Sequence, residues 1–271
     1  MPARLGQAPH SRWSVYPHIL PVAQRRLNIL PAFREQFWEW SVYQKIRLHS
    51  DFHHLNSSQA LCFNLFFPLL TQDGHGLSHI VKALGLTGVP VPGACFEFVP
   101  DSIEGTNFDF VIPLASGGRI LFEVKYTETA FGSAKEDDEH RRKFQNVYYP
   151  RIAGRFEPSF CAAGMFLKNY QILRNLWHLD LASDDTAVFL FPRANRSLAR
   201  TEATLRSCLL ESFHSRAIVV YIEDLISALD ADVVPRCKLE AEAFSQFRLK
   251  YLPTSSSLEK TSAASPAAPT R

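Results

Sequence analysis

The chain has 271 residues, of which 46% are hydrophobic and 21% are charged, with a formal net charge of +2 and a pI near 8.3. This composition excludes a chain that is disordered throughout, and it predicts a globular protein with one sizeable core. The mild basic charge neither demands nor opposes a nucleic-acid partner, so local clusters of charge are more informative than the total.

The cysteines are few and widely separated. They stand at positions 62, 95, 161, 208 and 237 and form no CxxC pair, which predicts neither a zinc knuckle nor a disulfide framework. No export signal is visible after the initial Met, and the longest apolar run, ALCFNLFFPLL, is too short to span a membrane. We therefore expect a cytoplasmic protein without a membrane span.

Residues 1–55 are predicted to form an N-terminal arm and a helix that packs on the core. Pro31 stands at an N1 position and opens a helix-like segment that extends to His49. Two groups of histidines, at 49, 53 and 54 and at 75 and 79, lack acidic or cysteine partners at a ligand spacing, so zinc is not predicted. The glycines beside His75 and His79 make a helix there doubtful.

A buried helix is predicted next. Asn56, Ser57 and Ser58 form an N-cap cluster before QALCFNLFFPLL, whose apolar residues nearly surround the helix axis. Gln59 and Asn64 are the polar exceptions, and a polar side chain on a buried helix needs a partner.

A first strand is predicted at 95–98. Phe96 and Phe98 would point to one face of the sheet and Glu97 to the other. Glu97 is thus a candidate third carboxylate that would complete a metal site or bind a second ion. Glu104, in the following loop, is its weaker competitor.

The stretch from Thr106 to Glu128 carries the strongest chemical signal. Two apolar runs flank Ser116-Gly117-Gly118, which predicts an antiparallel hairpin with a loop at 116–118. In this register Asp109 pairs with Lys125. Alternation then gives one face that is apolar, made of Phe108, Phe110, Ile112, Ile120, Phe122, Val124 and Tyr126.

The opposite face of this hairpin gathers Asp109, Glu123 and Lys125, about 5–8 Å apart at Cβ. Hard cations such as Mg²⁺ bind through one or two carboxylates and keep several waters, so two such groups would hold a metal beside a phosphate. Lys125 would then orient the attacking water or stabilise charge on the phosphorus. The alternative is a half-solvated sheet with ordinary surface charges.

A charged helix is predicted at 133–147. Basic residues gather at its end and just beyond it, beside two tyrosines, and form the best candidate surface for a DNA backbone; they are Arg141, Arg142, Lys143 and Arg151. The alternative is a solvated helix face.

The remaining elements favour a helix-covered sheet with parallel pairing. A helix is predicted at 164–181, with Gln171 and Arg174 on one face, and strands at 187–192 and 217–222 enclose a helix at 197–213. A last helix is predicted at 238–251. The Ser-, Thr-, Ala- and Pro-rich tail at 252–271 is expected to be disordered.

The spacing D-x(13)-E-V-K across a hairpin resembles the PD-(D/E)xK superfamily of restriction-endonuclease-like nucleases, with Asp109, Glu123 and Lys125 at the motif positions. SSQALCFNLFFPL at 57–69, CFEF at 95–98 and EVKYTE at 123–128 further resemble a bacterial branch of largely unassigned biology. Phe108, rather than Pro, precedes Asp109. Pro100-Asp101 is a literal Pro-Asp, which makes Asp101 the rival first acidic residue.

The resemblance implies an α/β domain at 56–251 with a mixed central sheet flanked by helices. It implies metal ligation by Asp109 and Glu123, with the Val124 carbonyl and Glu97 as further ligands. Other residues are implied to support the site, and Gln59, which would bond a metal ligand or a phosphate, has the alternative of a solvated amide. The supporting residues are Gln59, Glu128, Gln171 and Arg174.

The activity predicted from the sequence is a Mg²⁺-dependent DNA endonuclease, with Mn²⁺ as a substitute. The alternative is a nucleic-acid-binding module that keeps the fold without the chemistry. Cleavage of both strands would suggest a homodimer, because one site cuts one strand at a time.

Overall fold

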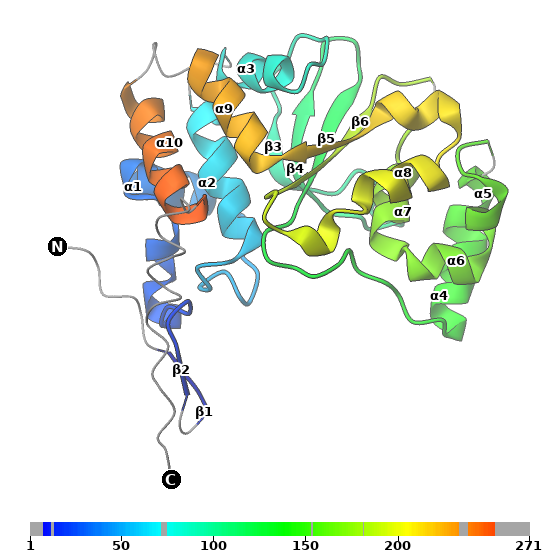
Figure 1. Ribbon diagram of the computed structural model, residues 1–271, viewed down its shortest axis with the longest axis horizontal. Coiled ribbons are helices and arrows are strands. Elements are labelled where there is room, and N and C mark those ends of the chain that lie inside the picture. The colour runs from blue at the N-terminus through cyan, green and yellow to red at the C-terminus, as the bar shows by residue number, and fades with distance from the viewer. Residues whose placement is uncertain are drawn as a thin grey trace.

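A computed structural model describes residues 8–11, 14–71, 75–152, 154–180, 182–232 and 238–252. Within these residues, the main sheet has five strands in the order β3-β4-β5-β6-β7 (Figure 1). The strands are β3 (Cys95–Phe98), β4 (Phe108–Pro113), β5 (Arg119–Val124), β6 (Thr186–Phe191) and β7 (Ala217–Tyr221). The first three are antiparallel and the last three are parallel, which confirms the predicted α/β class with a mixed sheet. A separate hairpin joins β1 (Ala8–Ser11) and β2 (Ser14–Tyr16).

Helices cover both faces of the sheet (Figure 1). One side carries η1 (Val22–Asn28), η2 (Pro31–Phe33), α1 (Arg34–Tyr43), α2 (Ser58–Leu70), α3 (His75–Ala83), α9 (Ile222–Asp232) and α10 (Lys238–Tyr251). The other carries α4 (Asp138–Lys143), η3 (Phe144–Tyr148), α5 (Tyr149–Ile152), η4 (Pro158–Cys161), α6 (Ala163–Lys168), α7 (Tyr170–Trp177), η5 (Arg196–Leu198), α8 (Thr201–Cys208) and η6 (Glu211–Arg216).

Two apolar cores lie on the two sides of the sheet. In the first, the Phe66 ring of α2 stacks on Phe110 of β4 with centroids 4.4 Å apart. In the second, which also contains Phe144 and Trp177, the Phe189 ring of β6 packs edge-on against Phe131 with centroids 5.4 Å apart. Every residue of β6 is buried, as expected for a parallel strand with helices on both faces.

Helix α2 is buried as the sequence predicts, and Asn64 shows how its polar exceptions are accommodated. The Ser57 hydroxyl accepts the N–H of Ala60 and caps the helix. The Asn64 amide accepts the N–H of Leu30 at 2.9 Å and donates to the Asn28 carbonyl and to the Tyr251 hydroxyl. This one side chain therefore joins the N-terminal segment to α10.

The hairpin register differs from the prediction by two residues. Phe110 pairs with Phe122 and Pro113 with Arg119, so the loop is 115–117 and Asp109 is aligned with Glu123 rather than with Lys125. Gly117 adopts the positive φ of 86° that the loop requires. The Gly118 carbonyl accepts the Leu114 N–H, so Gly118 is paired with Leu114 and lies outside the loop. Because an even shift preserves the faces, Asp109 and Glu123 still share one.

Glu97 interrupts the predicted alternation of β3. Its φ is +55°, a left-handed conformation that costs a non-glycine residue free energy. Phe96 packs in the core beneath α2, but Phe98 packs with Phe108 against Val111 and Leu121. The predictions that Phe96 and Phe98 share a face, and that Phe108 lies on the face of Phe110, are therefore wrong.

Several predicted helices have different bounds. The first ends at Tyr43 because Lys45, with φ +54°, turns the chain and the Ile46 N–H returns to the Ser41 carbonyl. The helix predicted at 164–181 breaks at Asn169 into α6 and α7. The regions predicted as helices at 133–147 and 197–213 are built of shorter helical segments, and a helix forms at His75–Ala83 where glycines made one doubtful.

The predicted tail lies outside the described residues apart from Leu252. In the described part of the chain, no helix has the length and apolar character needed to cross a membrane.

Lys250 gives a test of the packing beneath α10. Its ammonium donates to the carbonyl and the side-chain oxygen of Asn28, each at 2.6 Å, and burial lowers the pKa of Lys250 from 10.5 to about 7. Between pH 7 and pH 10.5 the unfolded chain binds one proton more than the folded protein, so the free energy of unfolding rises with pH. We expect Lys250→Met to reduce this rise by about 1 kcal/mol per pH unit, measured by urea unfolding between pH 7 and pH 9. The exposed Lys168→Met should leave the pH dependence unchanged, and an identical slope in both variants would contradict the burial of an ionisable amine at this position.

Candidate active site

The structure brings Asp109, Glu123 and Lys125 together at one end of the β4–β5 pair. Asp109 precedes Phe110 and Glu123 follows Phe122, so the two carboxylates are aligned across neighbouring strands. Asp109 Oδ2 accepts the N–H of Val124 at 2.6 Å, and Lys125 Nζ lies 2.8 Å from Glu123 Oε1. The side chains of Glu123 and Lys125 are only 5% and 13% exposed. The cluster is therefore a largely enclosed group of charges and differs from a solvated sheet face.

Helix α7 supplies neutral donors to Glu123. Gln171 Nε2 donates to Oε1 at 2.6 Å and Asn175 Nδ2 donates to Oε2 at 2.9 Å. The two amides are one helical turn apart, so both point to the same carboxylate. Gln171 was predicted to support the site, whereas Asn175 was missed, although its i+4 spacing from Gln171 was a usable signal.

Electrostatics distinguishes the three charged groups. Burial, followed by the like charge of Glu123, raises the pKa of Asp109 well above its usual range. Burial alone would lower the pKa of Lys125, but the charges of Glu123 and Asp109 outweigh it and raise that pKa. Lys125 therefore stays protonated, and the second carboxylate, Asp109, lacks a comparable cationic partner.

Glu97 lies beside this cluster and is held by polar side chains from several segments. Its two oxygens accept from Gln59 Nε2 at 2.7 Å and from Asn107 Nδ2 at 2.5 Å, and His49 Nε2 is 3.7 Å away. Burial would raise the pKa of Glu97, but these hydrogen bonds outweigh it and lower that pKa. Gln59 thus contacts a candidate metal ligand, and the alternative of a solvated amide is wrong because Gln59 is 1% exposed.

Gln59 also fixes the segment that carries His49. Its Nε2 donates to the Arg47 carbonyl at 3.0 Å, and its Oε1 accepts the backbone N–H of His49 at 2.9 Å. The proximity of His49 to Glu97 was not predicted, because it depends on contacts between residues far apart in the sequence.

Glu104 has a different position from that of a metal ligand. It is fully buried, and one oxygen accepts from Arg174 Nε and from the Tyr148 hydroxyl, each at 2.7 Å, while the other accepts the Thr106 N–H and contacts His178 Nε2. Burial would raise the pKa of Glu104, but these partners outweigh it and hold that pKa well below its usual range. Arg174, predicted as a support of the site, therefore binds Glu104 and anchors α7.

Glu128 closes the loop after β5. Its carboxylate accepts the N–H of Tyr126 at 2.6 Å, and Asn195 Nδ2 donates to the carbonyls of Tyr126 and Glu128. The Glu128 charge also helps to raise the pKa of Lys125. Its contribution is to shape the loop that follows Lys125.

The predicted DNA-binding residues differ in their partners and in their exposure. Arg141 pairs with Glu136 at 2.7 Å, and Arg142 donates to the Asp138 carbonyl. Lys143 points inward and donates to the Glu104 carbonyl, and Arg151 stacks 4.4 Å over the Trp177 ring. Arg141, Arg142 and Arg151 are exposed, whereas Lys143 is partly buried.

Asp101, the rival for the first acidic position, caps a turn. Its Oδ1 accepts the N–H groups of Ile103 and Glu104, and it is not among the residues that contact Glu123 or Lys125 in the described part of the chain. The geometry thus favours Asp109 as the acidic partner of Glu123.

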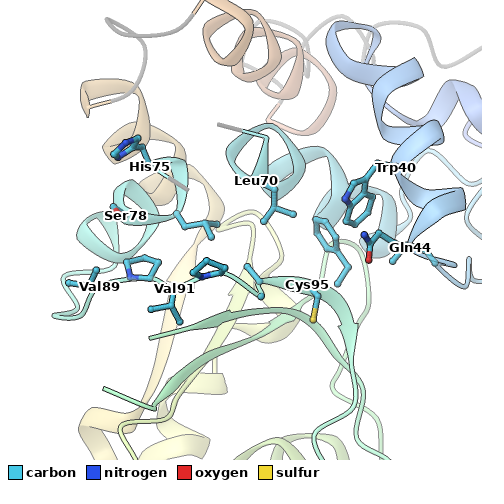
Figure 2. Close-up of a pocket in the computed structure, with 15 residues that line it drawn as sticks. Trp40, Gln44, Leu70, His75, Ser78, Val89, Val91 and Cys95 are labelled. Atoms are coloured by element: carbon cyan, nitrogen blue, oxygen red, sulfur yellow. The ribbon is translucent and has the colours of Figure 1, made fainter. Parts of the chain in front are cut away.

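A cavity of about 730 Å³ lies elsewhere in the described structure (Figure 2). It is bounded by α1, α3 and the edge strand β3, and apolar groups such as Trp40, Leu70 and Val91 line much of it. Asp109, Glu123 and Lys125 are not part of its lining. The charged cluster is therefore separate from this apolar cavity.

The described residues contain no group of three or more His, Cys, Asp and Glu side chains arranged to hold a metal ion. A cation at this site would therefore be held by two carboxylates, with its other ligands supplied by water, the backbone or substrate, as Mg²⁺ tolerates.

The mixed sheet, with its carboxylates on the antiparallel hairpin and helices on both faces, is consistent with the restriction-endonuclease-like class of α/β cores. A sequence model of the family described as "Restriction Endonuclease associating with ARP" matches residues 4–252, so the chain belongs to this family. Searches of curated proteins and of solved structures gave no match. The family description supports a nuclease-like role.

Glu104 gives a test of how α7 is anchored. Glu104→Gln keeps the side-chain shape but leaves the largely buried Arg174 without its carboxylate, so we expect about 3 kcal/mol less stability at pH 7 in urea unfolding. Because the folded pKa is depressed, the wild-type contribution is lost as the pH falls below about 4.5, and the two proteins should converge in acid. Glu202→Gln, which breaks an exposed pair with Arg206, should cost less than about 0.5 kcal/mol. A difference that stays constant from pH 7 into acid would contradict an ionised Glu104.

Proposed function

We propose that the chain is a Mg²⁺-dependent nuclease that hydrolyses phosphodiester bonds in DNA. The observation that carries this proposal is the alignment of Asp109 with Glu123 on neighbouring strands, with Lys125 against the second carboxylate. Membership of a restriction endonuclease family supports the same reaction class.

The donor set fits a hard divalent cation. Glu123 forms an ion pair with Lys125 and accepts hydrogen bonds from Gln171 and Asn175. Asp109 Oδ2 accepts the Val124 N–H, but its Oδ1 has no hydrogen-bond donor among the described residues. A buried carboxylate beside a like charge is stabilised by an added cation.

Asp109 and Glu123 would hold Mg²⁺, with Mn²⁺ as a substitute and with the Val124 carbonyl as a further candidate ligand. Glu97, whose oxygens accept from Gln59 and Asn107, would lie beside the ion rather than on it. The ion would polarise the phosphoryl group and lower the pKa of a water molecule.

Lys125 acts as a positioned cation. Since its pKa is raised, it keeps its proton at neutral pH and does not serve as a general base. An ammonium carries three N–H donors, and Glu123 accepts one of them. The others orient the attacking water and stabilise the negative charge that develops on the phosphoryl oxygens.

The amides of α7 hold the reacting geometry in place. Gln171 and Asn175 fix both oxygens of Glu123, so that carboxylate is oriented before substrate arrives. Gln59 does the same for Glu97. Helix α7 and helix α2 thus support the site from opposite sides of the sheet.

Plasmid cleavage tests the proposed activity. We expect nicking of supercoiled DNA in Mg²⁺ or Mn²⁺, with activity reduced at least about 100-fold in Asp109→Asn and in Lys125→Met. Asp101→Asn should retain activity, because that carboxylate only caps a turn. Linearisation without a nicked intermediate would indicate a homodimer that cuts both strands.

The opposite results are equally informative. Activity that survives Asp109→Asn and disappears in Asp101→Asn would assign the first acidic position to Asp101. Binding of DNA without any cleavage in either metal would support the catalytically inactive nucleic-acid-binding module.

Thermal unfolding tests the metal site separately. Without metal, Asp109→Asn should raise the melting temperature, because the amide oxygen still accepts the Val124 N–H while the repulsion from Glu123 is removed. With Mg²⁺, the wild type should gain stability and the variant should not. Equal gains in both proteins would place any bound cation elsewhere.

A further inference from the structure

We propose that a nucleic-acid backbone reaches the candidate active site along the segment between α1 and α2, where Lys45, Arg47 and His49 form a line of exposed basic side chains. We call these three residues the 45–49 track. The inference rests on the proposed function in one respect only, that the substrate is a phosphodiester chain.

The track results from an alternation of exposed and partly buried residues. Lys45, Arg47 and His49 are exposed, whereas Ile46 and Leu48 between them pack against the core beneath α2. The left-handed conformation of Lys45 follows the end of α1 and begins this non-helical segment. Lys45 lies at the turn that ends α1, and Arg47 and His49 follow it at alternate positions, so all three basic side chains are exposed on this segment.

The track leads to the carboxylate cluster. Gln59 holds the Arg47 carbonyl and the His49 N–H, and the same amide donates to Glu97. His49 Nε2 lies 3.7 Å from Glu97, and the charge of Glu97 contributes to the raised pKa of Asp109. A phosphate chain that places one phosphate at Asp109 would therefore have its neighbours beside these basic groups.

The charges of Lys45 and Arg47 are not neutralised locally, whereas His49 lies against the Glu97 carboxylate. Lys45 and Arg47 form no ion pair or side-chain hydrogen bond with any described residue. At its far end, Lys45 borders a hollow of about 710 Å³ that is also lined by Arg25 and Arg26. Arg25 likewise has no acidic partner among the described residues, whereas Arg26 pairs with Glu35. Basic groups with unneutralised charge are the electrostatic signature of a phosphate-binding surface.

An exposed aromatic side chain accompanies these charges. Tyr43, at the end of α1, is 82% exposed, although a ring of this size is usually covered. Aromatic rings next to basic groups bind nucleic acids by stacking on bases. This feature favours a nucleic acid over a protein partner with acidic side chains alone.

The region around α4 is a weaker candidate for the same role. Residues 135–143 contain four basic and four acidic residues, whose charges cancel, and Lys143 is turned inward. Residues 42–49 contain Lys45 and Arg47 and no acidic residue. The net positive charge next to the carboxylate cluster is thus supplied by the N-terminal segment.

Fluorescence anisotropy with a short labelled DNA duplex in EDTA tests the track without requiring cleavage. For Lys45→Gln/Arg47→Gln we expect about tenfold weaker binding at physiological salt, and a salt dependence of log K that is shallower by about two. The matched control Lys168→Gln/Arg200→Gln changes one lysine and one arginine at exposed positions and should leave both quantities unchanged. All variants should have the melting temperature of the wild type.

The affinity and the salt dependence of log K distinguish the possible results. A slope and affinity equal to those of the wild type in Lys45→Gln/Arg47→Gln would overturn the proposal, as would a loss of binding confined to Arg141→Gln/Arg142→Gln. An equal loss in the Lys168→Gln/Arg200→Gln control would also overturn it, because the effect would then follow total charge. Cleavage is measured in parallel: a wild type that binds through the track but cuts no DNA contradicts the proposed nuclease and leaves the track intact.

Discussion

The arrangement of the site depends on the need of one almost buried carboxylate, that of Glu123, for hydrogen-bond donors on both oxygens. Those donors are Lys125, directly after the strand of Glu123, and Gln171 and Asn175 of α7. Since α7 lies on the far side of the sheet from α2, the second core has to place it within hydrogen-bond distance of β5. The packing of Trp177 and the ion pair between Arg174 and Glu104 do this.

The common face of Asp109 and Glu123 could be predicted from the sequence, because side chains alternate between the two faces of a strand whatever the exact pairing. The register was wrong by two residues, yet Asp109 and Glu123 kept a common face, since an even shift does not exchange the faces of a strand. The parallel strands, the buried α2 and the α/β class followed in the same way from local composition and from the order of the elements. Gln171 was identified through resemblance and its helical position.

Features that depend on distant partners were not accessible in this way. In the sequence, Glu104 resembles an ordinary solvated loop glutamate. Its burial depends on Arg174 and His178, which lie some seventy residues later in the chain and contact its carboxylate. The left-handed conformation of Glu97 leaves no mark in the sequence, because residues other than glycine adopt it only where surrounding contacts impose it. The inward contact of Lys143 with the Glu104 carbonyl was inaccessible for the same reason, because the two residues are 39 positions apart in the sequence.

Helix α7 and its C-cap residue, His178, carry two pairs of polar residues at i, i+4 spacing. Gln171 and Asn175 bind Glu123, and Arg174 and His178 bind Glu104. A helix advances by about 100° per residue, so inserting or deleting one residue before Gln171 within this helix would turn both pairs away from their carboxylates at once. A change in the length of this helix would therefore remove the support of two buried charges in a single step, whereas a single substitution on α7 affects one of them. The length of the helix has to match the distance between Glu123 in β5 and Glu104 in the 101–106 loop.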